Sequence, residues 1–217
     1  MERRKFLLNE NFFDSWSPEM AYVLGFWFAD GYMRHEKSYR IVFNSRDYNL
    51  LLQIKKCFNC GYSPKRYQRR DGIDYQLVLY SKHLYQSLLA LGGMRRKSKK
   101  IKFPRIPKQY LADFIRGYFD GDGSVFYTTY IHSKTKKYRR ELRSNFTSGS
   151  PRFLEDLQSV LVNNLGFLKK RIGLYNNGAS RKLGYGTKDT LSLMRFMYYK
   201  GYSIGLKRKA AFLRNNV

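Results

Sequence analysis

Two short segments of this chain share one design: Val23–Gly31 (VLGFWFADG) and Ile115–Gly123 (IRGYFDGDG). Each is an apolar run of helical length that contains small residues four positions apart, and each ends in Asp-Gly. Residues four apart lie on one face of a helix, and small side chains there let two helix backbones approach closely. The pair therefore predicts two helices that pack together and bring the carboxylates of Asp30 and Asp122 to the same end.

A cation between these two carboxylates is the expected reason for bringing them together. The small residues expected in the helix contact are Ala21, Gly25, Ala29, Gly117 and Gly121. Two close carboxylates repel unless a proton or a cation lies between them. Mg²⁺ fits because it prefers carboxylate, water and phosphate oxygens, and Mn²⁺ or Ca²⁺ could occupy the same site. The motifs therefore predict a metal-dependent phosphodiesterase centre in which Asp30 and Asp122 are metal ligands and catalytic residues.

Other interpretations of the acidic and thiol residues are weaker. A single Asp-Gly after a helix is typical of an ordinary helix stop, but two copies at equivalent repeat positions favour catalysis. A calcium loop beginning at Asp120 fails, since its sixth residue is Val125 and its twelfth is Ile131. Cys57 and Cys60 lack a second pair of zinc ligands at suitable spacing, so two reduced thiols are expected.

The charge of the chain predicts a polyanionic partner. It has 42 Lys and Arg against 16 Asp and Glu, a formal net charge of +26. Nucleic acid is the leading partner; an acidic membrane surface is the alternative, but the sequence has no long apolar span and no isolated basic amphipathic helix. The N-terminal apolar stretch is too short for a signal peptide. We expect an intracellular protein, in the cytoplasm or an organelle matrix.

The chain follows one plan twice: helix, two strands, helix, two strands, helix. After the first motif come a strand, a helix, a hairpin that turns at Asp71-Gly72, and a helix, at 39–45, 48–58, 65–80 and 84–91. After the second motif the same elements fall at 141–148, 151–165, 168–185, with a turn at Asn177-Gly178, and 190–199. This predicts an α+β fold of two pseudo-symmetric αββαββα repeats, 1–91 and 107–217, joined by a basic linker, 92–106. Each antiparallel sheet should carry helices on one face only.

The other face of each sheet is the expected DNA contact. Polar faces on single alternating strands are usually just solvated. Here several strands in both halves put Arg, Lys, Gln and Asn opposite the core, and these side chains read base edges and phosphates in the major groove. In the second hairpin, Leu168, Ile172 and Leu174 are expected to face the core. The predicted DNA-binding residues are Arg40, Asn44, Arg46, Arg66, Gln68, Arg70, Gln76, Arg139, Arg143, Asn145, Lys169, Arg171, Tyr175 and Lys182.

The paired motifs and the repeat order resemble the single-chain LAGLIDADG homing endonucleases over nearly the whole chain. The resemblance implies sheets that form a DNA-binding saddle, motif helices paired at the repeat interface, and metal binding by Asp30 and Asp122. The first motif has Phe28 where many members have an acidic residue, whereas the second keeps Asp120. In the family this position usually serves the helix interface or its capping, so the departure does not by itself threaten catalysis.

The same resemblance implies a basic residue near each scissile phosphate, from the segment after the last helix of each half. The matching residues are Lys97, with Lys99 as the next choice, and Lys207. The plain alternative for both segments is a solvated basic tail. Polar residues at the ends of the second strands, 44–47 and 147–150, are candidates to position water.

These observations predict a monomeric, Mg²⁺-dependent endonuclease that breaks both strands of a non-palindromic DNA target of two helical turns, about 20 base pairs. The resemblance implies cleavage across the minor groove with short 3′ overhangs, in the homing of an intron or similar mobile element. Inteins can carry such domains, but the sequence has no splicing junction, so a free-standing or intron-encoded enzyme is expected.

Two other function classes compete with the endonuclease. A non-cleaving protein of the same fold, either an RNA maturase that binds intron RNA or a DNA-binding regulator, is the main alternative. The presence of both Asp30 and Asp122 argues for the nuclease. A basic ribosomal or structural RNA-binding protein explains the charge but not the paired motifs.

Overall fold

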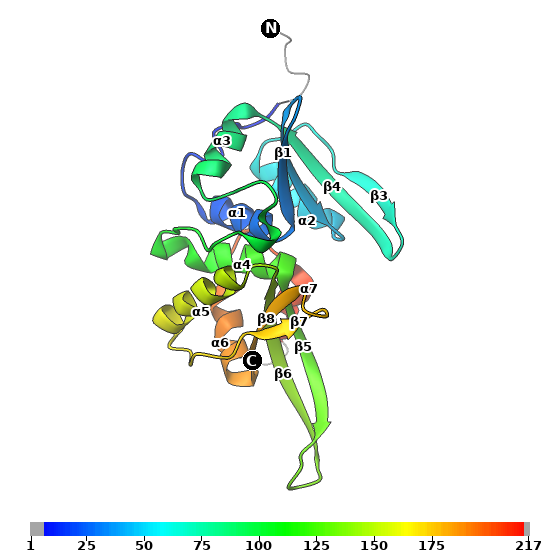
Figure 1. Cartoon of the computed structure of the whole chain (residues 1–217), viewed down its shortest axis with the longest axis vertical. Coiled ribbons are helices and arrows are strands. Elements are labelled where there is room, and N and C mark those ends of the chain that lie inside the picture. Colours follow the sequence, from blue (N-terminus) through cyan, green and yellow to red (C-terminus); the bar gives the residue numbers. More distant parts are fainter. Residues whose placement is uncertain (1–6, 215–217) are drawn as a thin grey trace. The chain divides into compact units, whose positions relative to one another are not determined.

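The computed structural model describes residues 7–214, and its elements follow the predicted order (Figure 1). The helices are α1 (Pro18–Asp30), α2 (Tyr48–Cys57), α3 (Lys82–Ala90), α4 (Leu111–Asp122), α5 (Pro151–Leu165), α6 (Thr187–Met197) and α7 (Lys207–Arg214), with 3-10 turns η1 (Lys97–Lys99) and η2 (Lys108–Tyr110). The strands are β1 (Gly31–His35), β2 (Tyr39–Ser45), β3 (Lys65–Arg69), β4 (Gly72–Tyr80), β5 (Gly123–Ile131), β6 (Tyr138–Ser148), β7 (Gly173–Tyr175) and β8 (Ser180–Tyr185). The prediction of two αββαββα repeats is confirmed.

The chain divides into two compact units that do not coincide with the repeats. Unit 1 comprises residues up to Lys97 together with Pro104–Gly121 and Gly201–Gly205. Unit 2 comprises Ser98–Phe103, Asp122–Lys200 and the chain from Leu206. The second motif helix, α4, therefore packs with the first repeat up to Gly121, and its last residue, Asp122, begins the main part of unit 2.

Unit 1 contains a four-stranded antiparallel sheet in the order β1-β2-β4-β3. Helices α1, α2 and α3 all contact β2. Ile41 and Phe43 of β2 and Leu77 and Leu79 of β4 are fully buried, so the apolar face of the sheet lies under the helices. The strand periodicity of two fixes this division, because successive side chains point to opposite faces.

Unit 2 repeats the plan with strand order β5-β6-β8-β7. Helices α5 and α6 contact β6 and β8, and α7 contacts β5. Leu142 and Phe146 of β6 and Leu183 of β8 form the buried sheet face, as expected for the first two. Helix α5 starts at Pro151 after the Ser150 cap and ends at Gly166, whose φ of 67° terminates it.

The second hairpin of unit 2 differs from the prediction. A strand was expected from Leu168, but β7 covers only Gly173–Tyr175. Leu168 and Leu174 are 76% and 69% exposed, so the expectation that they face the core was wrong. Phe167 takes that role instead: it is buried, and its ring lies 5.1 Å from that of Tyr185. Once Phe167 fills the core directly after α5, the following residues run along the surface.

Candidate catalytic and DNA-binding site

Helices α1 and α4 touch through their glycines, within unit 1. A Cβ on Gly25 would lie 2.0 Å from the Phe114 carbonyl oxygen, and one on Gly117 would lie 2.0 Å from the Tyr22 carbonyl oxygen. No side chain fits at those distances, so both positions require glycine. At the end of the contact, a Cβ on Gly121 would lie 2.4 Å from the Ala29 Cβ. The predicted small-residue contact between the motif helices is confirmed.

A buried polar cluster accompanies this contact. The Tyr22 hydroxyl donates to Asp120 Oδ2 at 2.8 Å, so the acidic residue of the second motif bonds across the helix pair. Arg116, which is fully buried, donates to Asp113 Oδ1 at 2.7 Å and to the Ile204 carbonyl at 2.9 Å. In α1 the position equivalent to Asp120 is Phe28, which is buried with its ring 5.5 Å from that of Phe114.

The motif aspartates end their helices, and the backbone carbonyl of each accepts a hydrogen bond from a polar side chain of the second strand of its repeat. In unit 1, Asn44 Nδ2 donates to the Asp30 carbonyl at 3.0 Å, and Asp30 Oδ2 lies 3.2 Å from the position of a Cβ on Gly121. In unit 2, Thr147 Oγ1 donates to the Asp122 carbonyl at 2.9 Å. Asp30 and Asp122 are both half-buried. The Asp30 carboxylate therefore lies against the end of α4, one residue before Asp122.

Each unit also has a buried lysine at the end of its motif helix. In unit 1, Lys97 Nζ donates to the carbonyls of Phe28 and Ala29, at 2.5 and 2.6 Å. In unit 2, Lys209 Nζ donates to the Gly123 carbonyl at 2.7 Å. Lys97 and Lys209 are only 8% and 4% exposed. The helix dipole favours a cation at a helix C-terminus, so a lysine suits both positions.

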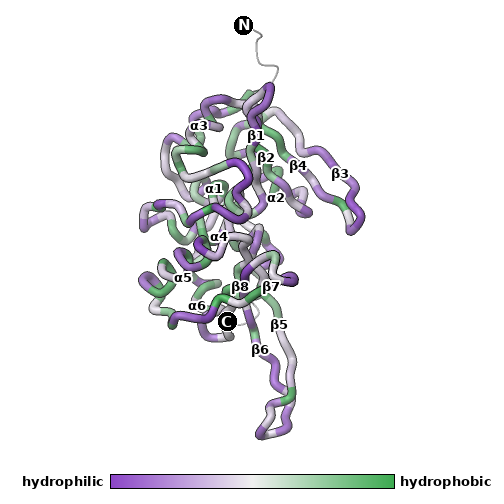
Figure 2. The backbone as a smooth tube through the Cα atoms, in the orientation of Figure 1, coloured by the Kyte–Doolittle hydropathy of each residue, from purple (hydrophilic) through white to green (hydrophobic). Residues whose placement is uncertain are grey.

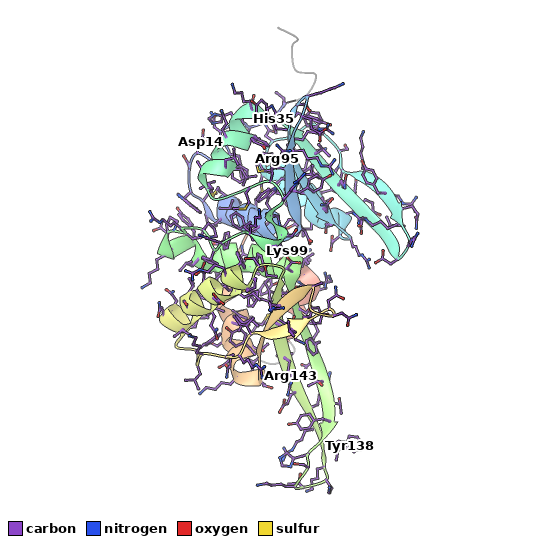
Figure 3. The ribbon with its side chains drawn as sticks, viewed as in Figure 1. Asp14, His35, Arg95, Lys99, Tyr138 and Arg143 are labelled. Carbon is purple, nitrogen blue, oxygen red and sulfur yellow. The ribbon has the colours of Figure 1, made fainter. Side chains whose placement is uncertain are left out.

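The structure separates the lysines that the sequence offered as alternatives. Lys99 is exposed (Figure 3), whereas Lys97 reaches the end of α1. Lys207 is exposed at the start of α7, and Lys209 occupies the position that corresponds to Lys97. The helical period could have identified Lys209 in the sequence. Lys209 follows the buried Leu206 by three residues and therefore lies on the apolar face of α7.

Few protein ligands for a metal gather here. Within residues 7–214, no group of three or more His, Cys, Asp or Glu side chains could hold a metal ion. Mg²⁺ does not require such a group, because it usually keeps several waters and takes further oxygens from substrate phosphates. Cys57 offers no thiolate ligand, because burial raises its pKa to about 11.

The unit 1 sheet exposes part of the predicted DNA-binding set on one face. Arg40 pairs with Tyr80 and Asn44 with Gln76 across β2 and β4, so Arg40, Asn44 and Gln76 share the face opposite the helices. This face forms a groove of about 640 Å³. Arg40 Nε in this groove and Asn44 Oδ1 on the same sheet face are buried and have no hydrogen-bond partner among the described residues. The groove residues include Tyr32, Arg34, Arg40, Val42, Tyr62, Lys65, Tyr67, Gln76, Val78 and Tyr80.

The first hairpin corrects the rest of that set. Gln76 pairs with Lys65, so Lys65 rather than Arg66 shares its face. Arg66 and Gln68 therefore lie on the opposite face, and Lys65, Tyr67 and Arg69 are the β3 residues that the prediction missed. Arg70 lies in the turn rather than on the strand. Arg46 follows β2 and forms ion pairs with Asp71 and Asp74; its hydrogen bond holds the pKa of the Asp71 carboxyl below its ordinary value.

The unit 2 sheet carries most of its predicted residues on one face. Arg139, Arg143 and Asn145 alternate along β6 opposite the buried Leu142 and Phe146, as predicted. Lys182 pairs with Thr147 and shares that face, and its Nζ lies 5.0 Å from the centre of the Tyr175 ring. The other two predicted residues, Lys169 and Arg171, are exposed but precede β7, so they belong to a surface segment and not to a strand.

Comparison with known proteins agrees with this architecture. Residues 109–183 match the model of the LAGLIDADG-like domain family. The chain carries a LAGLIDADG-like domain. Solved LAGLIDADG proteins have the same fold as this chain over almost the whole length of the chain. The homing endonuclease I-WcaI bound to its DNA recognition sequence matches with a TM-score of 0.63 and 16% identity, over 94% of this chain and 91% of that one.

Two further LAGLIDADG structures match in the same way. The meganuclease I-AabMI bound to uncleaved DNA has a TM-score of 0.60 and 15% identity, over 92% of this chain and 88% of that one. Mesophilic variants of the homing endonuclease I-DmoI have a TM-score of 0.59 and 20% identity, over 95% of this chain and 99% of that one. These likenesses establish the LAGLIDADG fold of both repeats.

The curated relatives are much longer proteins. The chain is 30% identical over 204 residues to the probable translation initiation factor IF-2 of Thermococcus kodakarensis. This match covers 89% of this chain but only 16% of that protein. A match of 30% over 149 residues to the probable translation initiation factor IF-2 of Methanocaldococcus jannaschii covers 65% of this chain and 11% of that protein. The chain thus spans less than a fifth of the length of either relative.

No helix among residues 7–214 is long and apolar enough to span a membrane.

Proposed function

We propose that this LAGLIDADG chain is a homing endonuclease that hydrolyses both strands of a specific DNA site in a Mg²⁺-dependent reaction. One observation supports this above all others. Each motif helix ends in a half-buried aspartate, and a buried lysine bonds to backbone carbonyls at the same helix end. Two such ends, related by the repeat, provide one acidic and one basic group for each DNA strand.

Asp30 and Asp122 would hold the metal, which supplies Lewis-acid activation of the phosphate and of a water nucleophile. Lys97 and Lys209 are fixed by their carbonyl bonds, so their ammonium groups are positioned to stabilise negative charge that develops on each phosphate. Asn44 holds the Asp30 backbone through its amide nitrogen, while its buried Oδ1 has no partner among the described residues. In this proposal that oxygen would accept a hydrogen bond from water, the role for which residues 44–47 are candidates.

The polar faces of the two sheets would contact the duplex. In unit 1 this face includes Arg40, Asn44 and Gln76, and in unit 2 it includes Arg143, Asn145 and Lys182. Arginine, asparagine and glutamine make bidentate contacts with guanine and adenine in the major groove. DNA is also the molecule bound in the solved structures of I-WcaI and I-AabMI.

The curated relatives bear on the mobile element. A nuclease has no evident task in a translation initiation factor, and the matched segment is a small part of each factor. We therefore propose that the matched segments are insertions of the intein type, and that this chain belongs to the same kind of element. This replaces the intron-encoded origin that the sequence favoured.

The test is cleavage of a DNA library by the purified full chain. A pool of duplexes with a randomised central region of about two helical turns is incubated with Mg²⁺, and cleaved molecules are sequenced. We expect one enriched, non-palindromic site, no cleavage with excess chelator, and no cleavage by the Asp30→Asn, Asp122→Asn double variant. Specific binding without cleavage would instead support the regulator, and enrichment of nothing would reject both.

A further inference from the structure

The sheets of the two units differ in the length of one ribbon. In unit 1, β2 pairs with β1 through Tyr39–Phe43 and with β4 through Arg40–Ser45. Only Tyr39 of β2 is therefore paired with β1 but not with β4. In unit 2, β5 pairs with Tyr138–Phe146 of β6, but β8 pairs only with Ser144–Ser148. The six residues Tyr138–Arg143 are therefore paired with β5 alone. We call residues 126–143 the β5–β6 arm, which extends beyond β8 in unit 2 (Figure 1).

The surface of the arm is basic and aromatic. It contains Lys134, Lys136, Lys137, Arg139, Arg140 and Arg143, and its only acidic residue is Glu141. Tyr138 is 77% exposed and Ile131 is 54% exposed. Hydrophilic residues dominate its tip (Figure 2). An isolated two-stranded ribbon is at best marginally stable in water, and exposed large apolar side chains on such a ribbon indicate a contact surface.

The arm continues the DNA-facing side of its sheet. Tyr130 pairs with Arg139 and Phe126 with Arg143, so these four side chains share the face of Asn145. Glu141 lies between them: it accepts a hydrogen bond from the Tyr130 hydroxyl at 2.6 Å, and Arg143 bonds to it at 3.0 Å. Tyr138 and Arg143 lie on the projecting ribbon in Figure 3.

The opposite face of the arm is braced at its base. The Arg140 guanidinium lies 3.7 Å from the centre of the Tyr127 ring, and that ring lies 5.8 Å from the Phe212 ring of α7. Toward the tip, Lys134, Lys136 and Lys137 are exposed. The arm is therefore anchored in unit 2 at one end and presents its cations at the other.

We propose that the β5–β6 arm binds duplex DNA beyond the base pairs that the unit 2 sheet covers, so that the target extends further from the cleavage site on one side than on the other. The major groove is wide enough to admit a two-stranded β-ribbon. Six strand residues at about 3.3 Å each reach about 20 Å, which corresponds to about six base pairs. Lys134, Lys136 and Lys137 at the tip would meet phosphates at the far end of this length.

This proposal rests on the proposed function only for its ligand, double-stranded DNA, and it is tested by binding without cleavage. The duplex is one selected from a randomised library for binding to the full chain with Ca²⁺. The arm variant is Lys134→Gln, Lys136→Gln, Lys137→Gln. The matched control is Lys188→Gln, Arg195→Gln, Lys200→Gln, which removes the same charge from exposed positions on or just after α6.

Hydroxyl-radical footprints and a salt titration give the readout. We expect the arm variant to lose protection over about six base pairs at one end only, and its salt slope to fall by up to about 2.7, at roughly 0.9 per lost phosphate contact. The control should keep the wild-type footprint. An arm variant whose footprint and salt slope match those of the control overturns the proposal, as does a wild-type footprint of equal length on both sides of its centre.

The two proposals fail in different ways. An asymmetric footprint that depends on the arm, together with no cleavage in Mg²⁺, would reject the endonuclease and keep the arm contact. Site-specific cleavage with a symmetric footprint would do the reverse. Thermal unfolding of all three proteins checks folding, and a second arm variant, Tyr138→Ser, tests the same contact without a change in charge.

Discussion

The buried lysine of unit 1 lies on the short 3-10 turn η1, whereas that of unit 2 lies on the helix α7. Lys97 bonds to the last residues of its motif helix, and Lys209 bonds to the residue directly after its own. The strand partners also differ, since an asparagine holds Asp30 and a threonine holds Asp122. The two halves thus keep a carboxylate, an ammonium and a polar bond to the backbone, while the elements that supply them change.

The motif helices differ in a second way. Asp120 of α4 accepts a hydrogen bond from Tyr22, whereas Phe28 of α1 packs among aromatic rings. The position of Phe28 and Asp120 therefore lies in the interior of the helix pair. Either a hydrogen-bonded polar group or an apolar ring is acceptable there. The terminal aspartates show no such exchange, which is expected if chemistry fixes them.

The strongest test of the comparison replaces each terminal aspartate by itself. Asp30→Asn and Asp122→Asn should each reduce double-strand cleavage by about 10³-fold or more, because each removes a charged metal ligand. Linearisation of a supercoiled target plasmid measures this, and binding in Ca²⁺ serves as the control. If one variant cleaves at the wild-type rate, the two halves do not carry equivalent catalytic groups.

The next largest effect is expected for the two buried lysines. Lys97→Met and Lys209→Met should each slow cleavage by about 10²-fold, the usual cost of losing one group that stabilises transition-state charge. Lys207→Met is the matched control, because Lys207 is exposed two residues before Lys209, and it should leave the rate within about twofold. Single-turnover rates separate these outcomes from binding. A larger effect at Lys207 than at Lys209 would restore the residue that the sequence favoured.

The helix contact is tested through stability. Gly25→Ala and Gly117→Ala each insert a methyl group 2.0 Å from a backbone oxygen, so each should lower the free energy of unfolding by about 1–3 kcal/mol or more. Gly173→Ala meets nothing within 4 Å and should change it little. Denaturant titration measures all three. Equal stability of Gly25→Ala and Gly173→Ala would mean that the helices do not pack as described.

The smallest effects are expected for base reading. Arg40→Ala should relax preference at one or two base pairs on one side of the target, and Arg143→Ala on the other, by about 1–3 kcal/mol at the contacted pair. Cleavage of all single-base variants of the target provides the measurement. A uniform loss of affinity across variants would reassign these arginines to phosphate contacts.

The sequence predicted the backbone plan well and the side-chain placement less well. The motif helices, the two repeats and the glycine contact follow from helical and strand periods that extend over many residues. The errors come from short segments. On β3 a shift of one residue moves Arg66 to the opposite face and brings Lys65 to the face of Gln76, because the side-chain period of a strand is two.

Two other errors have the same physical origin. Lys207 and Lys209 differ only by their angle around α7, and the tertiary contact with Gly123 decides between them. Leu168 was expected inside because it is apolar, yet Phe167 beside it fills the core. The metal-binding and catalytic roles of the site residues remain predictions, since they depend on DNA and a cation.

The division of the chain into units has a consequence for its synthesis. The backbone passes between the two units five times, and unit 1 needs α4 and Gly201–Gly205, where the Ile204 carbonyl accepts a bond from Arg116. A nascent chain is made from its N-terminus, so unit 1 cannot complete its interior until the ribosome has translated Gly205. The last segment, α7 with Lys209, follows at once. A product that ends before Gly205 would therefore lack both a finished unit 1 and the second buried lysine.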